Sequence, residues 1–325
     1  MSILPESQNL GTAERLGAAE PVSRTSSELQ RTGLILEGGG MRGVYTSGIL
    51  RLFMDQGLHV PYVIGVSMGA CNGANYVSLQ PERNRMVNIP FVNDRRHNSF
   101  LRLLRTGEFF NMDFIFKTLP DSLVPFDTQT FMANGQRCIV GMTDCGTGEP
   151  RYLDQHEAGP DFLKVLQASC SLPFMARPVH LHGRCYMDGG IADPVPIRKS
   201  MADGNTRHIL ILTQPRGYRK KTSPLVKLAR FRYSRFPGLC QALRTRAESY
   251  NRDMELIDRM EAEGRIFVFR PDSKLTAKRI ERRKEILNMT YDQAYLDARR
   301  QWPALMAYLS RTGGMGSARS EAFER

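Results

Sequence analysis

Residues 62–77 read YVIGVSMGACNGANYV, an apolar run that leads into a serine and then into small residues. The apolar run predicts a β-strand, and the residues from Met68 onward predict a helix. Gly65 and Gly69 stand two residues to either side of Ser67. Glycines at this spacing allow a sharp strand-to-helix turn that exposes the serine hydroxyl at the foot of the helix. The same five residues also fit an ordinary tight turn, so the surrounding sequence has to decide between the two.

The sequence before this turn indicates that the serine belongs to a parallel α/β sheet. Residues 32–37 form an apolar run that continues into the glycine-rich segment GGGMRG, residues 38–43. Residues 44–57 then show helical spacing and end at a glycine. Strand, glycine loop, helix, strand, turn and helix follow one another, an order typical of α/β proteins with a parallel sheet.

Later segments add strands to this pattern. The further strands are expected at residues 137–142, 179–188, 207–213 and 265–269. His182 and Gly183 suit a hairpin corner within the second of these. Residues 82–136 mix aromatic and apolar clusters with loops, and we interpret them as an insertion or cap over the sheet.

The glycine-rich segment 38–43 has three interpretations. It matches the G-x-G-x-x-G fingerprint of dinucleotide sites, but those sites also need an acidic residue at the end of the second strand. Here the second strand ends at Ser67 and the nearest acid, Asp55, lies in the preceding helix, which argues against a nucleotide. The glycines could simply ease strand-to-helix packing. Alternatively, the loop presents backbone N–H groups at a helix N-terminus, where they and the helix dipole stabilise an oxyanion.

An activated serine also requires a base to take its proton. None of the six histidines stands where a hydrolase triad histidine is expected; His182 lies in the hairpin, and His208 opens a strand rather than following one. Asp188 ends a predicted strand, and Gly189 and Gly190 free the turn so that its carboxylate can point outward. An aspartate that bonds its own turn is the alternative. Because an aspartate of ordinary pKa, about 3.9, is a weak base, its site would have to tune it.

Three motifs therefore follow one another, at residues 38–43, 65–69 and 188–190. Their combination resembles the patatin-like phospholipases, specifically the bacterial branch with a C-terminal extension, and the likeness covers about residues 33–213. The resemblance implies a three-layer α/β/α fold with a mostly parallel central sheet. A basic, mainly helical C-terminal extension would follow this fold.

Carried onto this chain, the resemblance implies a role for each residue of the motifs. Ser67 would be the nucleophile and Asp188 the proton acceptor of a dyad without histidine. The backbone N–H groups of Gly39, Gly40 and Met41 would form the oxyanion hole. The whole loop comprises Gly38, Gly39, Gly40, Met41, Arg42 and Gly43, and the motif glycines are Gly65, Gly69, Gly189 and Gly190. Glu37 and the third residue of Asp-Gly-Gly depart from the common family pattern, but neither change removes a reactive group.

The implied activity is that of a serine acyl-ester hydrolase, which releases fatty acids from phospholipids or lysophospholipids through an acyl-serine. No cofactor is implied and no metal is expected, because the sequence shows no clustered pattern of His, Asp and Glu ligands. The competing hypothesis is a catalytically silent lipid- or nucleic-acid-binding protein on the same scaffold. The intact serine, aspartate and glycine loop argue against that hypothesis.

The charge of the chain indicates an anionic partner. The 325 residues carry a formal net charge of +12. Residues 216–246 concentrate lysines and arginines without any acidic residue and interleave them with leucines and phenylalanines. We expect this stretch to contact an anionic membrane, although a charged face that only keeps the protein in solution is the alternative. Nucleic acid is not favoured, because no nucleic-acid-binding motif is present.

The chain is expected to divide into a flexible N-terminal segment (1–31), a catalytic domain (32–213) and a basic, mainly helical C-terminal region (214–325). The sequence shows no signal peptide and no stretch suited to span a membrane. Its six cysteines include no CxxC pair and are expected to be reduced. The expected location is the cytoplasm, with peripheral contact at the inner membrane surface left open.

Overall fold

A mixed sheet of eight strands organises the chain in a computed structural model that describes residues 29–311. The strands are β1 (Thr32–Leu36), β2 (Tyr62–Val66), β3 (Arg137–Asp144), β4 (Pro150–Asp154), β5 (Val179–Leu181), β6 (Arg184–Asp188), β7 (Arg207–Ile211) and β8 (Ile266–Phe269). Their order is β5-β6-β3-β2-β1-β7-β8, and β4 pairs with β3 off this path. Five neighbouring strands, β3, β2, β1, β7 and β8, run parallel, whereas β4 and β6 pair antiparallel with β3. The prediction of a mostly parallel sheet is confirmed.

Helices connect the strands. The α-helices are α1 (Val44–Asp55), α2 (Met68–Val77), α3 (Arg83–Asn88), α4 (Phe100–Thr106), α5 (Thr128–Ala133), α6 (Gln155–Ala158), α7 (Phe162–Ser169), α8 (Ile197–Ala202), α9 (Val226–Arg232), α10 (Pro237–Ala262) and α11 (Lys284–Ser310). Short 3-10 segments are η1 (Gly40–Gly43), η3 (Gly159–Asp161) and η4 (Gly189–Ile191), and η2 (Phe114–Leu123) is a π-helix. The expected flexible segment 1–31 lies outside the described residues except for its last three.

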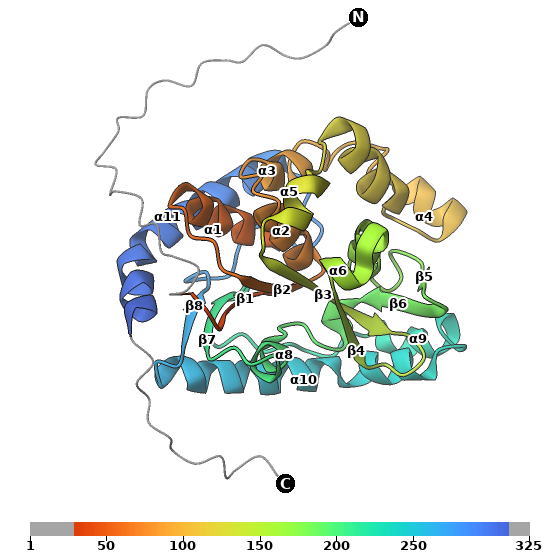
Figure 1. Ribbon diagram of the computed structural model, residues 1–325. Coiled ribbons are helices and arrows are strands. Elements are labelled where there is room, and N and C mark those ends of the chain that lie inside the picture. The colour runs from red at the N-terminus through yellow and green to blue at the C-terminus, as the bar shows by residue number, and fades with distance from the viewer. Residues whose placement is uncertain (1–28, 312–325) are drawn as a thin grey trace, which may run out of the picture.

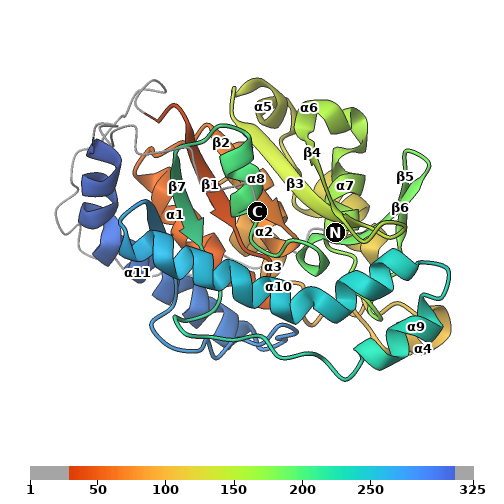
Figure 2. The same ribbon diagram turned by 90° about the horizontal axis from the view of Figure 1, so that it is seen from below.

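The side chains of the sheet alternate between two apolar layers, because successive residues of a strand point to opposite faces. Leu34 and Leu36 of β1 pack with α1, α2 and α11, whereas Ile35 between them packs with α8 and α10. Figures 1 and 2 show α1, α2 and α11 on one side of the sheet and α10 running along the other. This is the expected three-layer α/β/α arrangement.

The C-terminal region shares the sheet and the core of the preceding region. β8 pairs with β7 in parallel, so that residues 266–269 form one edge of the sheet. α10 and α11 cover opposite faces of it, and both contribute fully buried side chains. Through β8, α10 and α11, the C-terminal region is therefore packed onto the α/β layers (Figure 2). A division at residue 213 stays a prediction.

Residues 82–136 cover the end of α2. Aromatic and aliphatic side chains of η2 and Phe126 face Met68 and Cys71 of α2 and Leu166 of α7 across a narrow cavity. This placement agrees with the interpretation of the segment as a cap. The predicted hairpin corner is also present, because β5 and β6 pair antiparallel and His182 and Gly183 between them both have positive φ.

Candidate active site

Ser67 occupies the turn between β2 and α2, and its backbone is strained. Its φ of 54° and ψ of −131° are unusual for a residue with a side chain. Such conformations persist only where the surroundings impose them, and they gather at functional sites. The Ser67 N–H donates to Ser169 Oγ (2.8 Å), and that hydroxyl donates to the Gly141 carbonyl (2.6 Å). Buried partners therefore fix the turn from below.

The two glycines of the pentapeptide are required by close backbone packing. A Cβ on Gly69 would lie 2.5 Å from the Leu36 carbonyl oxygen, and a Cβ on Gly65 would lie 2.7 Å from the Gly69 carbonyl carbon. Contacts this short would force the backbone to move. The turn can therefore form in this position only because both residues lack a side chain, as the spacing in the sequence indicated.

The glycine-rich loop lies directly beside Ser67. A Cβ on Gly38 would lie 3.2 Å from Ser67 Cβ, and Gly40 has a φ of +57°. The Met41 N–H donates to the Arg279 carbonyl oxygen at 3.0 Å, so this expected oxyanion donor already has an acceptor. Among residues 29–311, the structure gives the N–H groups of Gly39 and Gly40 no acceptor. These two donors are open to a ligand at the start of η1.

The rest of the loop leads into α1. The Gly43 carbonyl accepts hydrogen bonds from Ser47 Oγ (3.2 Å) and Asn72 Nδ2 (2.7 Å), which fasten the loop to α1 and α2. The Arg42 guanidinium donates to the side-chain oxygen of Gln214 when the amide of Gln214 is placed with its oxygen toward the guanidinium. Arg42 thus extends toward the cavity rather than into solvent.

Asp188 ends β6 and is almost completely buried. Its Oδ1 accepts the Gly190 N–H at 2.9 Å, which is the turn hydrogen bond that the alternative interpretation expected. Its backbone is held by Ser171 and Thr143. Its Oδ2 is also buried and has no hydrogen-bond partner among the described residues. One carboxylate oxygen therefore fixes the turn, and the other remains available as an acceptor.

Ser67 lies where two cavities meet. A cavity of about 510 Å³ is lined by Ser67, Asp188 and the loop glycines, and by residues after 213. An adjacent cavity of about 130 Å³ is lined mainly by apolar side chains of α2, η2 and α7. Gly40, Ser67, Leu172 and Arg279 line both. A molecule bound at Ser67 can thus extend into two different environments.

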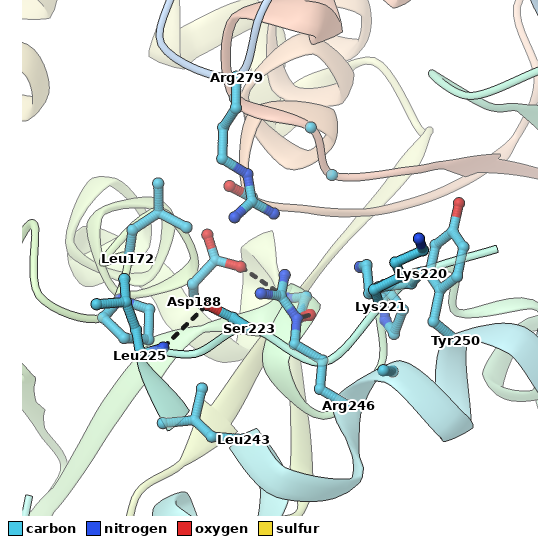
Figure 3. Close-up of a pocket in the computed structure, with 18 of the residues that line it drawn as sticks. Leu172, Asp188, Lys220, Lys221, Ser223, Leu225, Leu243, Arg246, Tyr250 and Arg279 are labelled. Carbon is cyan, nitrogen blue, oxygen red and sulfur yellow. Dashed lines mark hydrogen bonds between the residues drawn. The ribbon is translucent and has the colours of Figure 1, made fainter. Parts of the chain in front are cut away.

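The larger cavity is rich in positive charge. Five cationic side chains line it, Arg42, Lys220, Lys221, Arg246 and Arg279, against two carboxylates, Glu37 and Asp188. Figure 3 shows Arg246 and Arg279 on either side of Asp188, with Lys220 beside Tyr250. Burial and the neighbouring guanidiniums lower the pKa of Lys220 well below its ordinary value. Burial, reinforced by Arg279, lowers the pKa of Arg246 to about 10.

Of these cations, the sequence predicts only Arg42 at the site, as part of the glycine-rich loop. It places Lys220 and Arg246 in the stretch expected to contact a membrane, whereas both line the cavity. The position of Arg246 in the sequence does indicate a buried location, because it lies within the apolar stripe of α10, between Leu243 and Tyr250. A cation on such a stripe points into the protein. Lys220 and Arg279 lie in loops, where no periodicity could have placed them.

Two family models match this chain. The family model "Patatin-like phospholipase" matches residues 34–200, and "Domain of unknown function (DUF6363)" matches residues 236–310. The uncharacterized protein YjjU of Escherichia coli is 29% identical over 206 residues, which cover 62% of this chain and 57% of that protein. The present chain thus spans somewhat more than half of YjjU.

More distant relatives carry names that state an activity. Lysophospholipase NTE1 of Saccharomyces cerevisiae is 27% identical over 188 residues, 54% of this chain and 10% of that protein. The corresponding protein of Aspergillus terreus is 28% identical over 174 residues, 51% of this chain and 11% of that protein. Among solved structures, VipD from Legionella pneumophila aligns with a TM-score of 0.42 and 13% identity over 84% of this chain and 67% of that chain.

Proposed function

This chain belongs to the patatin-like phospholipase family, and we propose that it is a lipid acyl hydrolase that cleaves phospholipids or lysophospholipids with Ser67 as nucleophile and Asp188 as base. The observation that carries the proposal is the position of Ser67. It stands on a strained turn, beside the open N–H groups of Gly39 and Gly40, at the meeting point of two cavities. The lysophospholipase name of the NTE1 relatives supports the same class of reaction.

The proposed reaction has two steps. Asp188 Oδ2 accepts the Ser67 proton while Oγ attacks the ester carbonyl, and the N–H groups of Gly39 and Gly40 stabilise the tetrahedral oxyanion. As this intermediate collapses, Asp188 gives that proton to the leaving oxygen, so that the lysolipid or glycerophospho alcohol departs and an acyl-serine remains. Water then gives a proton to Asp188 as it attacks the acyl-serine; the fatty acid is released, and the proton passes from Asp188 to Ser67 Oγ.

The apolar cavity is the proposed site of the acyl chain. Its walls include Phe116, Leu119, Phe126, Leu163 and Leu166, contributed by the cap and α7. Burial of apolar surface stabilises a bound chain by roughly 0.8 kcal/mol per CH₂ group. A cap of this kind therefore favours long acyl chains over acetyl esters.

The decisive experiment compares the wild-type protein with Ser67→Ala on p-nitrophenyl butyrate and on decanoyl lysophospholipids. We expect the variant to lose roughly 10³-fold or more in kcat, since residual catalysis from the remaining site is small. Ser249→Ala is the matched control, because this α10 serine lines neither cavity. Equal rates in wild type and Ser67→Ala would refute the proposed hydrolase.

An anionic membrane is the proposed surface on which the enzyme works, at the cytoplasmic side. Leu225, Leu228 and Phe231 are exposed at the start of and along α9, and α4 exposes Phe100 and Leu104, the latter at 84%. α4 and α9 lie at the same end of the molecule (Figures 1 and 2), and both carry arginines. Apolar side chains between cations match the boundary of headgroups and acyl chains in anionic bilayers. Among residues 29–311, the helices are too short or too polar to pass through a bilayer.

A further inference from the structure

Four half-buried cations of the larger cavity have no carboxylate paired with them. Within residues 29–311, no carboxylate lies within 4.0 Å of the side-chain nitrogens of Arg42, Lys220, Arg246 or Arg279. Buried cations without a paired anion are costly, so an excess of this kind indicates a binding site for an anion.

The two carboxylates of the cavity, Glu37 and Asp188, offset only part of the charge of these cations. Both oxygens of Glu37 are occupied: Oε2 accepts from the N–H and hydroxyl of Thr213, and Oε1 accepts from the Tyr250 hydroxyl at 3.0 Å. Asp188 uses one oxygen for the Gly190 turn. Two of the cations donate to neutral oxygens: Arg246 Nε to the Gly190 carbonyl at 2.6 Å, and Arg42 to the side chain of Gln214. Their remaining N–H donors stay available for an incoming anion.

The position of these cations relative to Ser67 identifies the part of a substrate that they face. Ser67 lies between the cationic cavity and the apolar cavity, and both Ser67 and Arg279 line the two. A lysophospholipid whose acyl chain occupies the apolar cavity and whose ester carbonyl lies at Ser67 must place its glycerol and headgroup in the cationic cavity. Arginine and lysine are the usual ligands of a phosphate group in such a position.

The cavity also disfavours a choline headgroup. A quaternary ammonium is usually held over the face of an aromatic ring, and Phe174, Tyr218 and Tyr250 line this cavity. The Lys220 ammonium already lies 4.1 Å from the centroid of the Tyr250 ring, the one that lies among the cations. A second cation would be repelled from this face and from the guanidiniums beside it.

We propose that the cationic cavity binds the phosphate monoester of a lysophosphatidate-type lipid, so that the enzyme selects anionic glycerophospholipids without a quaternary ammonium. This selectivity rests on the proposed hydrolase function. Three of its ligands, Lys220, Arg246 and Arg279, come from beyond residue 213, and the last two lie within the matched domain of unknown function. That domain thereby has a role in recognising the headgroup.

The test measures kcat/KM of the full chain on 1-decanoyl lysophosphatidate and 1-decanoyl lysophosphatidylcholine, which share one acyl chain. We expect a preference of about tenfold or more for lysophosphatidate, because one charge-assisted hydrogen bond alone has this effect. Lys220→Met and Arg279→Gln should each raise KM for lysophosphatidate and reduce the preference several-fold. The control Arg259→Gln replaces an exposed cation of α10 outside the cavity and should preserve it. Equal use of both lipids by wild type, or an unchanged preference in a folded Lys220→Met variant, would overturn the proposal.

A second measurement separates this proposal from the hydrolase function. Calorimetry with non-hydrolysable ether analogues of the two lipids needs no turnover, and it should show tighter binding of the phosphate analogue. If p-nitrophenyl butyrate is cleaved with Ser67 but the two analogues bind equally, the headgroup proposal fails and the hydrolase stands. If no ester is cleaved, preferential binding still supports the cavity assignment. Binding of inorganic phosphate as tightly as the lipid analogue would assign the cavity to free phosphate and refute the lipid headgroup.

Discussion

Residues 32–213 and residues 214–311 contribute to one cavity with different kinds of groups. The first region supplies backbone N–H groups, a strained serine turn and a short carboxylate, each held within hydrogen bonds or close glycine contacts. The second supplies long cationic side chains from loops and from α10. The proposed chemistry therefore depends on backbone geometry, which tolerates little change. The proposed headgroup recognition depends on individual side chains, each of which can be substituted without disturbing the others.

The largest expected effect concerns Asp188, the proposed base. Asp188→Asn keeps the size of the side chain and an oxygen for the Gly190 N–H, but it removes the proton acceptor. We expect kcat on p-nitrophenyl butyrate to fall roughly 10³-fold or more, with unchanged circular dichroism. His182→Ala, at the exposed hairpin corner, is the control and should retain most activity. A histidine variant that folds but loses turnover would point to a triad instead.

Gly40 tests whether the backbone of the loop is as sensitive as the comparison implies. An alanine there would have a φ of +57° and place its Cβ 2.5 Å from the Arg279 carbonyl oxygen. We expect about 1–2 kcal/mol of lost stability from the positive φ and a further loss of kcat, roughly 10- to 100-fold, as the donors move. Gly57→Ala is the matched control, with a φ of +66° and open space around it. If both variants keep full activity, the loop is not the oxyanion site.

The surface of the second region should respond to charge in a graded way. Arg230→Gln/Arg235→Gln removes two exposed cations near α9, each worth about 1 kcal/mol at an anionic membrane. We expect binding to vesicles of phosphatidylserine and phosphatidylcholine to weaken by about thirtyfold in a sedimentation assay. Arg259→Gln/Arg299→Gln removes two exposed cations on α10 and α11 and is the control. Equal binding of both double variants would leave solubility as the explanation of the basic stretch.

The smallest expected effect lies where the two regions meet. His208 of β7 is buried. Its backbone N–H donates to the Tyr308 hydroxyl of α11, and that hydroxyl lies within hydrogen-bonding distance of the His208 carbonyl. Burial, together with Arg265, lowers the pKa of the His208 imidazole to about 4. In the unfolded chain the pKa of His208 is near 6.5, so the unfolded state binds the proton more readily than the folded state. The free energy of unfolding therefore falls as the pH is lowered through 6.5. The free energy of unfolding in urea should drop by about 0.5–1 kcal/mol from this group between pH 7 and pH 6. His208→Gln should reduce that slope, whereas the exposed His156→Gln should not.

Local patterns predicted the strands and helices of both regions, including β8 and the helical C-terminal region, but they identified the side chains that line the cavity only in the first region. The alternation of the strands, the glycines around Ser67 and the Asp188 turn are local features, so their sequence spacing was sufficient. The positions of Lys220 and Arg279 depend on how loops of the C-terminal region pass over the sheet. No local sequence pattern predicts that path. The Met41 N–H illustrates the same limit: its position in the loop suggests an oxyanion donor, but it donates its hydrogen bond to the carbonyl of Arg279, 238 residues later.

The edge strand β8 has a further consequence for how the chain assembles. Until residues 266–269 are in place, β7 is an apolar, fully extended strand with one row of unpaired N–H and C=O groups. Such an edge pairs readily with another chain. We therefore expect any form that ends before β8 to aggregate through β7. By covering the edge of β7, the C-terminal region would thus also prevent self-association of the chain during synthesis, in addition to its contribution to the cavity.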